Sequence, residues 1–278
     1  MKEICVSQIE ELTARLCVSA NINLEPSITA ALAEAEETAP LARSVLGQLA
    51  ENARVAAELR IPMCQDTGMA VVFLEIGQDA RVTGGGLYDA VNAGVARGYE
   101  EGFLRKSVVA DPLRRVNTGD NTPAVIHAEI VPGEVFRVTV APKGFGSENM
   151  SALRMLVPAD GRAGVRDFVL ETVRRAGANP CPPIIVGVGV GGTFEQCALL
   201  AKKALLLDIN GRHADPFWAE FEGELLDEIN RLGFGPAGFG GRTTALGLRV
   251  LTFPTHIAGL PAAVNISCHA TRHATGEL

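Results

Sequence analysis

Hydrophobic residues recur at intervals of three and four positions through most of the first sixty residues. Ile9, Leu12 and Leu16 form one such series, and a second follows between residues 42 and 56. This spacing places apolar side chains on one face of a helix, and two prolines, at positions 26 and 40, stand where helices begin. Residues 1–60 are therefore predicted to form a helical N-terminal subdomain that carries no chemistry.

After residue 60 the pattern changes to short hydrophobic runs between glycine turns. The runs "MAVVFLEI" and "PPIIVGVGV" predict buried strands, and "AVIHAEIVPGEVFRVTVAP" predicts a hairpin that turns at Pro132-Gly133. The tail predicts two strands separated by a Pro and Gly corner. Amphipathic helices are predicted for "LYDAVNAGVARGYEEG", "VRDFVLETVRRAG", "TFEQCALLAKKALLL" and "PFWAEFEGELLDEINRLG".

These elements together predict an α+β fold. The helical subdomain is expected to pack on a mixed β-sheet core, residues 61–278, whose Gly- and Pro-rich loops form the functional site. No repeat or low-complexity linker interrupts the sequence, so we expect one domain over residues 1–278.

Composition and charge exclude several classes of protein. Hydrophobic residues at 47% and charged residues at 21% are ordinary globular values. The net charge of −7, with acidic and basic residues interspersed, argues against nucleic acid as a partner, because phosphate binding needs concentrated Lys and Arg. No secretory signal is visible, and one long uncharged run, 176–194, carries three prolines and five glycines, so no membrane helix is expected.

The glycines of "IIVGVGVGGTFEQCALL" have the spacing of a dinucleotide fingerprint. Gly187, Gly189 and Gly192 lie between a predicted strand and a predicted helix, and Asp208 stands 21 residues beyond the first glycine. The fingerprint's acidic residue belongs at the end of a second strand, for which the helix leaves no room. Close backbone packing is the preferred interpretation of these glycines, and a dinucleotide-binding module is the alternative from a different class.

Three of the six cysteines lie in predicted loops beside strands. Cys64 precedes Gln-Asp-Thr-Gly, Cys181 stands in "NPCPP", and Cys268 stands in "SCHATRH". The other three, at positions 5, 17 and 197, fall within helical patterns and are expected to be buried and inert. Without an export signal, reduced thiols in a cytoplasmic protein are expected. Separations of 117 and 87 residues match no zinc-finger or ferredoxin spacing, so the residues alone leave open a shared metal site, including structural zinc.

Six motifs carry a resemblance to a known family. They are "CQDTG", "NTGDNTPAVIH", "PKGFGSENMSAL", "NPCPPIIVGVGVGGTFEQCALLAKKALL", "INRLGFGPAGFGG" and "SCHATRH". Together, from about Asn52 to His273, they resemble the iron-sulfur hydro-lyases of the class I fumarase and L(+)-tartrate dehydratase family. The resemblance is to the α subunit, and it implies that Cys64, Cys181 and Cys268 hold a 4Fe-4S cluster with one iron open as a Lewis acid.

The same resemblance implies roles for other residues. Asp66 matches the family's active-site carboxylate and is expected to transfer a proton or to orient the group that does; the alternative is an Asx turn that stabilises the Thr67-Gly68 bend. Gln65 is expected to contact a substrate carboxylate, the alternative being a surface amide. His256, in "FPTHIAG", matches a histidine that reaches the substrate pocket, the alternative being a satisfied core histidine.

Two carboxylates on the substrate require positive charge. Arg105 matches the family arginine that binds one carboxylate, the alternative being a solvated helix end. Lys143 and the turn through Gly146 are expected to present donors to the other carboxylate or to the cluster. The family pattern "KGGGSEN" has a glycine where this chain has Phe145, so the turn lacks a third glycine there.

The resemblance also implies a partner and a substrate. Single-chain family members continue into a second domain, so a separate β subunit is expected to complete the active site in a hetero-oligomer. The motifs "PKGFGSENMSAL" and "SCHATRH" favour fumarate hydratase, which interconverts fumarate and (S)-malate. An L(+)-tartrate dehydratase α subunit is the alternative.

Overall fold

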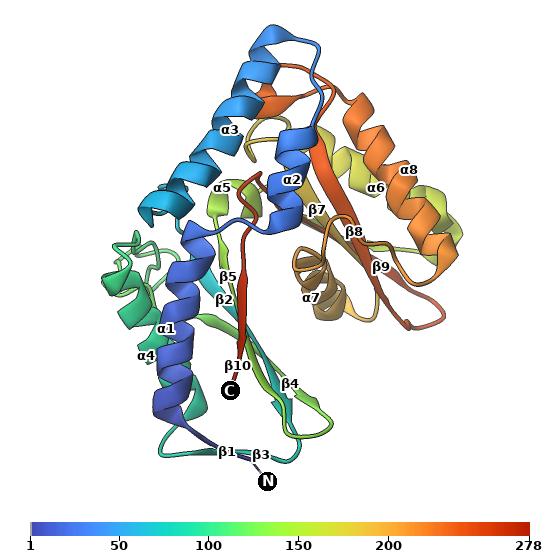
Figure 1. The fold of residues 1–278 in the computed structure, drawn as a ribbon. Coiled ribbons are helices and arrows are strands. Elements are labelled where there is room, and N and C mark those ends of the chain that lie inside the picture. The colour runs from blue at the N-terminus through green and yellow to red at the C-terminus, as the bar shows by residue number, and fades with distance from the viewer. Residues whose placement is uncertain (1) are drawn as a thin grey trace. The chain divides into compact units, whose positions relative to one another are not determined.

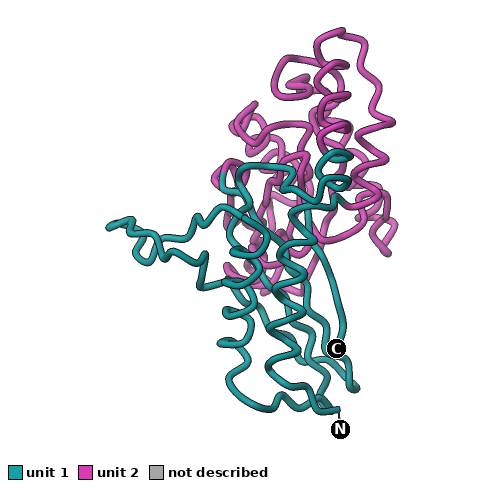
Figure 2. The backbone as a smooth tube through the Cα atoms, turned by 60° about the vertical axis from the view of Figure 1, so that its left-hand side comes forward, with its two compact units in different colours: residues 1–24, 53–145, 272–278 teal, residues 25–52, 146–271 magenta. Residues whose placement is uncertain are grey.

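The computed structural model describes residues 2–278 (Figure 1), and the chain divides into two compact units (Figure 2). Unit 1 comprises Met1–Leu24, Ala53–Phe145 and Arg272–Leu278. Unit 2 comprises Glu25–Asn52 and Gly146–Thr271. Each unit is assembled from segments that lie far apart in the sequence.

The helices follow the predicted apolar spacing, and prolines begin two of them at the expected positions 26 and 40. In chain order the helices are α1 (Val6–Ile22), α2 (Pro26–Glu34), α3 (Pro40–Leu59), α4 (Leu87–Glu101), α5 (Phe145–Glu148), α6 (Gly161–Ala176), α7 (Phe194–Ala204) and α8 (Pro216–Arg231). Two short 3-10 helices lie at Pro158–Asp160 and Pro236–Gly238. Helix α1 belongs to unit 1 and α2 to unit 2, so neither unit coincides with the subdomain expected over residues 1–60.

The strands are β1 (Lys2–Cys5), β2 (Met69–Gly77), β3 (Ala80–Thr83), β4 (Val125–Val131), β5 (Phe136–Lys143), β6 (Ala152–Leu156), β7 (Ile184–Gly191), β8 (Ala245–Phe253), β9 (Leu260–Ser267) and β10 (Ala274–Glu277). Strands β1 and β3 pair with each other in parallel. The remaining strands form two four-stranded sheets, one in each unit.

The sheet of unit 1 has the order β10-β5-β2-β4. Strand β2 pairs in parallel with β4 and antiparallel with β5. The predicted hairpin between β4 and β5 is therefore wrong: both strands exist, but β2 lies between them. The physical reason is burial, because β2 has five consecutive buried residues and a strand with that much apolar surface is stabilised most at the centre of a sheet.

Helices α1 and α4 pack against each other within unit 1, and α1 also contacts β5 and β10 (Figure 1). Alternate residues of β2 and β5, including Val72, Leu74 and Val138, share a core with apolar residues of both helices. Alternation is expected because successive side chains of a strand point to opposite faces of a sheet. This core supports the strand ends that carry part of the candidate site.

The sheet of unit 2 has the order β6-β9-β7-β8. Strand β7 is buried throughout, pairing in parallel with β8 and antiparallel with β9. Its valines at 186, 188 and 190 share a core with residues of α6 and α8, whereas its glycines at 187 and 189 meet α7. Unit 2 thus has helices on both faces of its sheet.

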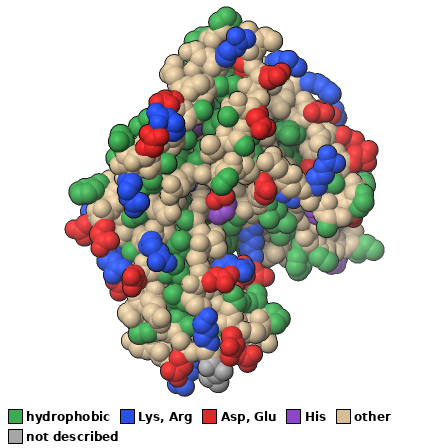
Figure 3. Space-filling view, in the orientation of Figure 1, with side chains coloured by type: hydrophobic (Ala, Val, Ile, Leu, Met, Phe, Trp, Pro, Cys, Tyr) green, Lys and Arg blue, Asp and Glu red, His purple; other side chains and the backbone are tan. Residues whose placement is uncertain are grey.

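The predicted α+β class is confirmed by these mixed sheets and their helices. Acidic and basic side chains are interspersed on the face seen in Figure 3. Among the described residues, no helix combines the length and the apolar character needed to cross a bilayer.

The glycines of the supposed dinucleotide fingerprint serve helix packing. A Cβ at Gly189 would lie 2.1 Å from the carbonyl oxygen of Cys197, and one at Gly187 would lie 2.1 Å from that of Ala201. Both glycines are inside β7 and not in a phosphate-binding loop. The interpretation of close backbone packing is therefore confirmed, and the dinucleotide alternative loses its structural basis.

We expect Gly189→Ala to destabilise the protein by about 1–3 kcal/mol or more, because α7 must move away from the sheet to admit the methyl group. Urea unfolding of the full chain measures this change. Gly223→Ala on α8 is the matched control, since its Cβ meets nothing within 4 Å and alanine favours a helix. Equal stability of the two variants would contradict the packing role.

Candidate functional site

The loops of unit 1 that carry family motifs meet at one end of its sheet. Residues 64–68 lead into β2, and Lys143 ends β5, where it is the register partner of Met69. Gly68 has a φ of +75°, and a Cβ there would lie 2.7 Å from the Lys143 backbone. Glycine is required at this crossing, and the crossing brings residue 66 to residues 143–145.

Asp66 joins the two loops. Its Oδ1 accepts a hydrogen bond from the Gly68 N–H at 3.1 Å, and its Oδ2 accepts one from the Phe145 N–H at 3.0 Å. The first contact is the Asx turn named as the alternative role. An ionised carboxylate has about four acceptor positions, so these two bonds leave Asp66 able to accept another.

Gln65 and Arg105 lie together. The Arg105 Nη1 donates to Gln65 Oε1 at 2.8 Å, and both side chains are exposed. The Arg105 backbone is fixed as well, because its carbonyl accepts a hydrogen bond from Thr67 Oγ1 at 3.1 Å. An amide and a planar guanidinium held side by side suit a carboxylate ligand.

Lys143 is 7% exposed, and its Nζ donates to the carbonyl of Gly144 at 3.3 Å. Unit 1 therefore brings together Gln65, Asp66, Arg105 and Lys143. Cys64, in the same loop, is half-buried. Gly146, the remaining residue predicted for this turn, is the first residue of unit 2 after Phe145.

Unit 2 brings together two of the three predicted cysteine ligands. Cys181 lies three residues before β7, and Cys268 directly follows β9, at the end where Ile185 pairs with Ser267. His269 Nδ1 lies 3.1 Å from the Cys181 carbonyl oxygen, which fixes residue 269 beside residue 181. Cys181 has a φ of +55°, a backbone conformation that non-glycine residues rarely adopt and that is held by surrounding contacts.

The motif "INRLGFGPAGFGG" lies at the same end of this sheet. The Ala237 N–H donates to the Pro182 carbonyl at 2.7 Å, one residue from Cys181. The buried carboxylate of Glu37 accepts from the N–H groups of Arg242 and Thr243 at 2.9 and 2.6 Å. The N-terminal segment, predicted to carry no chemistry, thus supports the chain directly after this motif.

The structure does not bring His256 to the cysteines of unit 2. Its loop follows β8 at the far end of the sheet, where Thr255 Oγ1 donates to the Gly192 carbonyl at 2.9 Å. Cys181 lies before the other end of β7, which spans about 23 Å at 3.3 Å per residue. The catalytic role expected for His256 stays a prediction, and the arrangement of residues within unit 2 does not support it.

His256 lines a separate cavity of about 370 Å³. Phe217, Trp218 and Phe221 form its aromatic wall, and Arg162 lies over the rings of Phe217 and Phe221 at 5.3 and 4.8 Å. His256 Nδ1 accepts a hydrogen bond from the Ala258 N–H at 3.2 Å. The imidazole is exposed and is not a satisfied core histidine.

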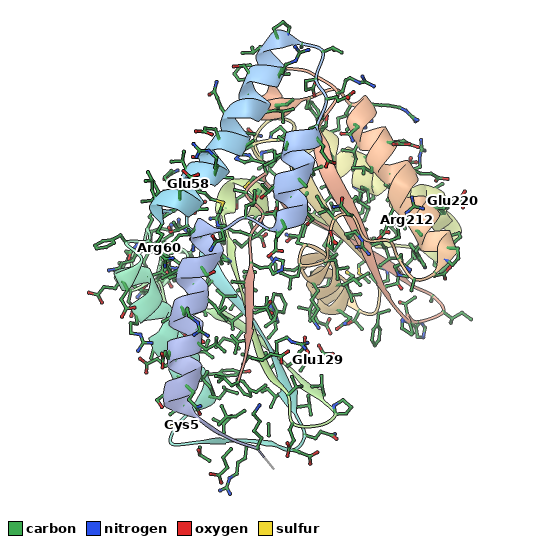
Figure 4. All side chains as sticks on the ribbon, viewed as in Figure 1. Cys5, Glu58, Arg60, Glu129, Arg212 and Glu220 are labelled. Atoms are coloured by element: carbon green, nitrogen blue, oxygen red, sulfur yellow. The ribbon has the colours of Figure 1, made fainter. Side chains whose placement is uncertain are left out.

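None of the six cysteines, all of which lie in the described chain, is in a disulfide. Cys17 and Cys197 are fully buried, as expected for inert thiols, and burial raises the pKa of Cys17 to about 12. For Cys5 the expected burial within a helix is wrong: it ends β1 and is exposed, just before α1, where Figure 4 labels it. Within residues 2–278, no three His, Cys, Asp or Glu side chains are arranged to hold a metal ion.

Comparison with known proteins decides the family. The family model described as "Fumarate hydratase (Fumerase)" matches residues 10–277. The chain belongs to the fumarate hydratase family. The resemblance found in the sequence motifs is confirmed, and the protein is a hydro-lyase.

Curated relatives align with nearly the whole length of this chain. A protein of Methanocaldococcus jannaschii named "Putative L(+)-tartrate dehydratase subunit alpha" is 41% identical over 275 residues, 96% of each chain. The "L(+)-tartrate dehydratase subunit alpha" of Escherichia coli strain UTI89 is 30% identical over 280 residues, 99% of this chain and 92% of the relative. The protein of the same name in Shigella sonnei is 29% identical over the same shares.

Proposed function

We propose that this chain is the α subunit of a two-subunit iron-sulfur hydro-lyase that interconverts fumarate and (S)-malate. The observation that carries the proposal is the assembly of Cys181 and Cys268 at one end of a sheet, fixed by the bond between His269 and the Cys181 carbonyl. The second support is the array of Gln65, Asp66 and Arg105 in unit 1.

The donor set fits a 4Fe-4S cluster. Three thiols, at positions 64, 181 and 268, lie half-buried or exposed in loops, and thiolates are the ligands that iron-sulfur clusters take. Cys64 belongs to unit 1 and the other two to unit 2, so a common site is part of the proposal. When bound, a cluster with three protein thiolates supplies a Lewis acid at its fourth iron.

The chain's own residues have separate roles in the proposed reaction. Dehydration of (S)-malate removes the C2 hydroxyl and a proton from C3, which together make one water, and no net electron transfer is needed. Arg105 and Gln65 bind one carboxylate, while Lys143 and the turn at Gly146 present donors to the other. Asp66 accepts the C3 proton or orients the group that does.

A β subunit is proposed to complete the site, because relatives that align with nearly the whole chain bear the name "subunit alpha". The role of His256 is proposed to lie in the assembled enzyme, since its exposed loop is remote from the cysteines of its own unit. A cytoplasmic location is part of the same proposal, in keeping with six cysteines outside disulfides.

L(+)-tartrate is the second candidate substrate. The relatives' printed names favour it, and the hydration chemistry is the same. Nothing in the residues of unit 1 separates a four-carbon diacid with one hydroxyl from one with two, so the choice belongs to a rate comparison.

We expect the α chain, reconstituted anaerobically with iron and sulfide, to gain hydro-lyase activity only when the β subunit is added, because the β subunit is proposed to complete the site. Fumarate absorbance measures turnover of (S)-malate, and parallel assays use L(+)-tartrate. Zinc-loaded α chain with β is the control. Full turnover by the α chain alone would overturn the need for the β subunit. Faster dehydration of L(+)-tartrate than of (S)-malate would overturn the assignment to fumarate. Equal activity of the zinc-loaded enzyme would overturn the proposal of an iron-sulfur cluster.

A further inference from the structure

Four buried polar side chains converge on the loop that carries Cys64, Gln65 and Asp66. They are Asn21 of α1, Tyr99 of α4, Asn121 before β4 and Arg272 before β10, and none is more than 5% exposed. All four belong to unit 1. Apolar residues would fill these positions without the cost of burying polar groups, so the loop itself must account for them.

Three of these side chains donate to backbone carbonyls of the loop. Tyr99 Oη donates to the carbonyls of Thr67 and Gly68 at 2.8 and 3.0 Å. Asn121 Nδ2 also donates to the Gly68 carbonyl, at 3.2 Å, and Arg272 Nη2 donates to the Asp66 carbonyl at 2.5 Å. Three consecutive carbonyls, residues 66 to 68, thus point at buried donors.

The same groups are tied to one another and to the helical layer. Arg272 Nε donates to Asn21 Oδ1 at 3.2 Å, and the Asn21 carbonyl accepts from the Met63 N–H at 3.0 Å. Asn121 Oδ1 accepts from the N–H groups of Ser107 and Val108 at 2.6 and 3.2 Å, just beyond Arg105. Burial raises the pKa of Tyr99, so its hydroxyl stays protonated and donates.

In this loop, side chains and not backbone pairing set the directions of the carbonyls. The loop ends before β2 begins, so its carbonyl directions are not set by sheet pairing. Fixing the carbonyl of a residue fixes the plane of the peptide unit that joins it to the next residue, because each peptide unit is planar. Holding the carbonyls of residues 66 to 68 therefore sets the direction in which Asp66 projects. The bond from the Met63 N–H to the Asn21 carbonyl holds the other end, so Cys64 and Gln65 lie between two fixed points, and side chains of a site work only when so held.

We propose that Tyr99, Asn121 and Arg272 are positioning residues that aim the Cys64-Gln65-Asp66 loop for its ligand and substrate contacts. The inference rests on the proposed function for the meaning of those contacts. The mechanical part concerns unit 1 alone and applies with or without a cluster. Arg272 lies four residues beyond Cys268. One motif therefore supplies a proposed cluster ligand, Cys268, and also a residue that supports the loop of a second proposed ligand, Cys64.

The test uses the full-length, cluster-free, reduced chain and iodoacetamide, with labelling of each cysteine followed by mass spectrometry. In Tyr99→Phe we expect Cys64 to be labelled roughly five- to tenfold faster, the factor that corresponds to one lost buried hydrogen bond. Cys17, fully buried in α1, should keep its wild-type rate. It reports whether the core between α1 and α4 has loosened.

Tyr88→Phe is the matched control, because it removes the chain's other phenolic hydroxyl from the same helix at an exposed position. We expect it to label as wild type. Equal acceleration of Cys64 and Cys17 in Tyr99→Phe would reduce Tyr99 to general stability, and an unchanged Cys64 rate would remove the positioning role. Should Tyr99→Phe fail to fold, Arg272→Lys answers the same question, since a single ammonium cannot replace the guanidinium fork.

A second arm separates this inference from the proposed function. Wild-type chain is reconstituted with iron and sulfide, and its absorption spectrum is compared with that of Tyr99→Phe. Failure of the wild type to take up iron overturns the proposed function and leaves the labelling result in force. A wild-type spectrum in Tyr99→Phe, together with normal kcat and KM in the complex, would show that aiming the loop has no consequence and would overturn the inference.

Discussion

Cys181→Ser is expected to leave the chain folded but unable to hold an iron-sulfur cluster. Cys181 is an exposed loop residue, so the loss of one sulfur removes no core packing. A serine hydroxyl is a poor replacement for a thiolate at iron. Even residues that only hydrogen-bond to a metal ligand lower metal affinity or activity 10- to 100-fold when they are changed. We expect iron and sulfide content to fall by at least about tenfold, with activity in the αβ complex falling at least as far as the 100-fold end of that range.

The control is Cys5→Ser, which makes the same chemical change at another exposed cysteine (Figure 4). We expect Cys5→Ser to bind iron and sulfide as wild type does. Cys268→Ser and Cys64→Ser should repeat the loss seen at position 181. A full cluster in any of these three variants, by anaerobic absorption and iron assay, would remove that residue from the ligand set.

Asp66→Asn is expected to lower kcat by about 10²–10⁴-fold, the usual contribution of a general acid or base. Asparagine keeps one oxygen and can maintain the Asx turn to the Gly68 N–H. It loses the charge and the second acceptor that receives the Phe145 N–H. Because the turn survives, we expect cluster content and Cys64 labelling to stay near wild type while kcat falls.

Asp208→Asn is the matched control, since Asp208 Oδ1 also accepts a backbone N–H two residues on, that of Asn210 at 2.9 Å. Its activity should equal that of wild type. The measurement is steady-state kinetics of the complex on (S)-malate and fumarate. A normal kcat for Asp66→Asn would leave only the structural role, and a parallel loss of cluster and activity would place Asp66 in loop support instead of proton transfer.

Much of the fold could be predicted from hydrophobic spacing, because long elements repeat their pattern enough times to be recognised. The strand of β2, the buried β7 and the helices α6 to α8 appear where the sequence places them. The short strands β1, β3, β6 and β10 have four or five residues, too few to establish alternation. The pairing of β4 and β5 was predicted wrongly because neighbours in sequence need not be neighbours in a sheet.

The candidate site was predicted through motifs. Motifs indicate the residues that contact a ligand better than they indicate the residues that hold those side chains in position. Asn121 and Arg272 lie inside family motifs. Their neighbours in sequence are polar, so the sequence does not indicate that these two side chains are buried. Tyr99 and Asn21 lie within helical patterns and carry no local signal at all. Their roles depend on contacts between residues 31 to 251 positions apart, which only the fold supplies.

The division of the chain has a consequence for the order of events during synthesis. Unit 2 is built from two segments that both precede residue 272, whereas the unit 1 sheet includes β10, translated after all of them. Its partner β5 leaves the ribosome more than a hundred residues earlier and has an unpaired edge until then. The unit that is completed later is therefore the one that contains α1, the first helix in chain order.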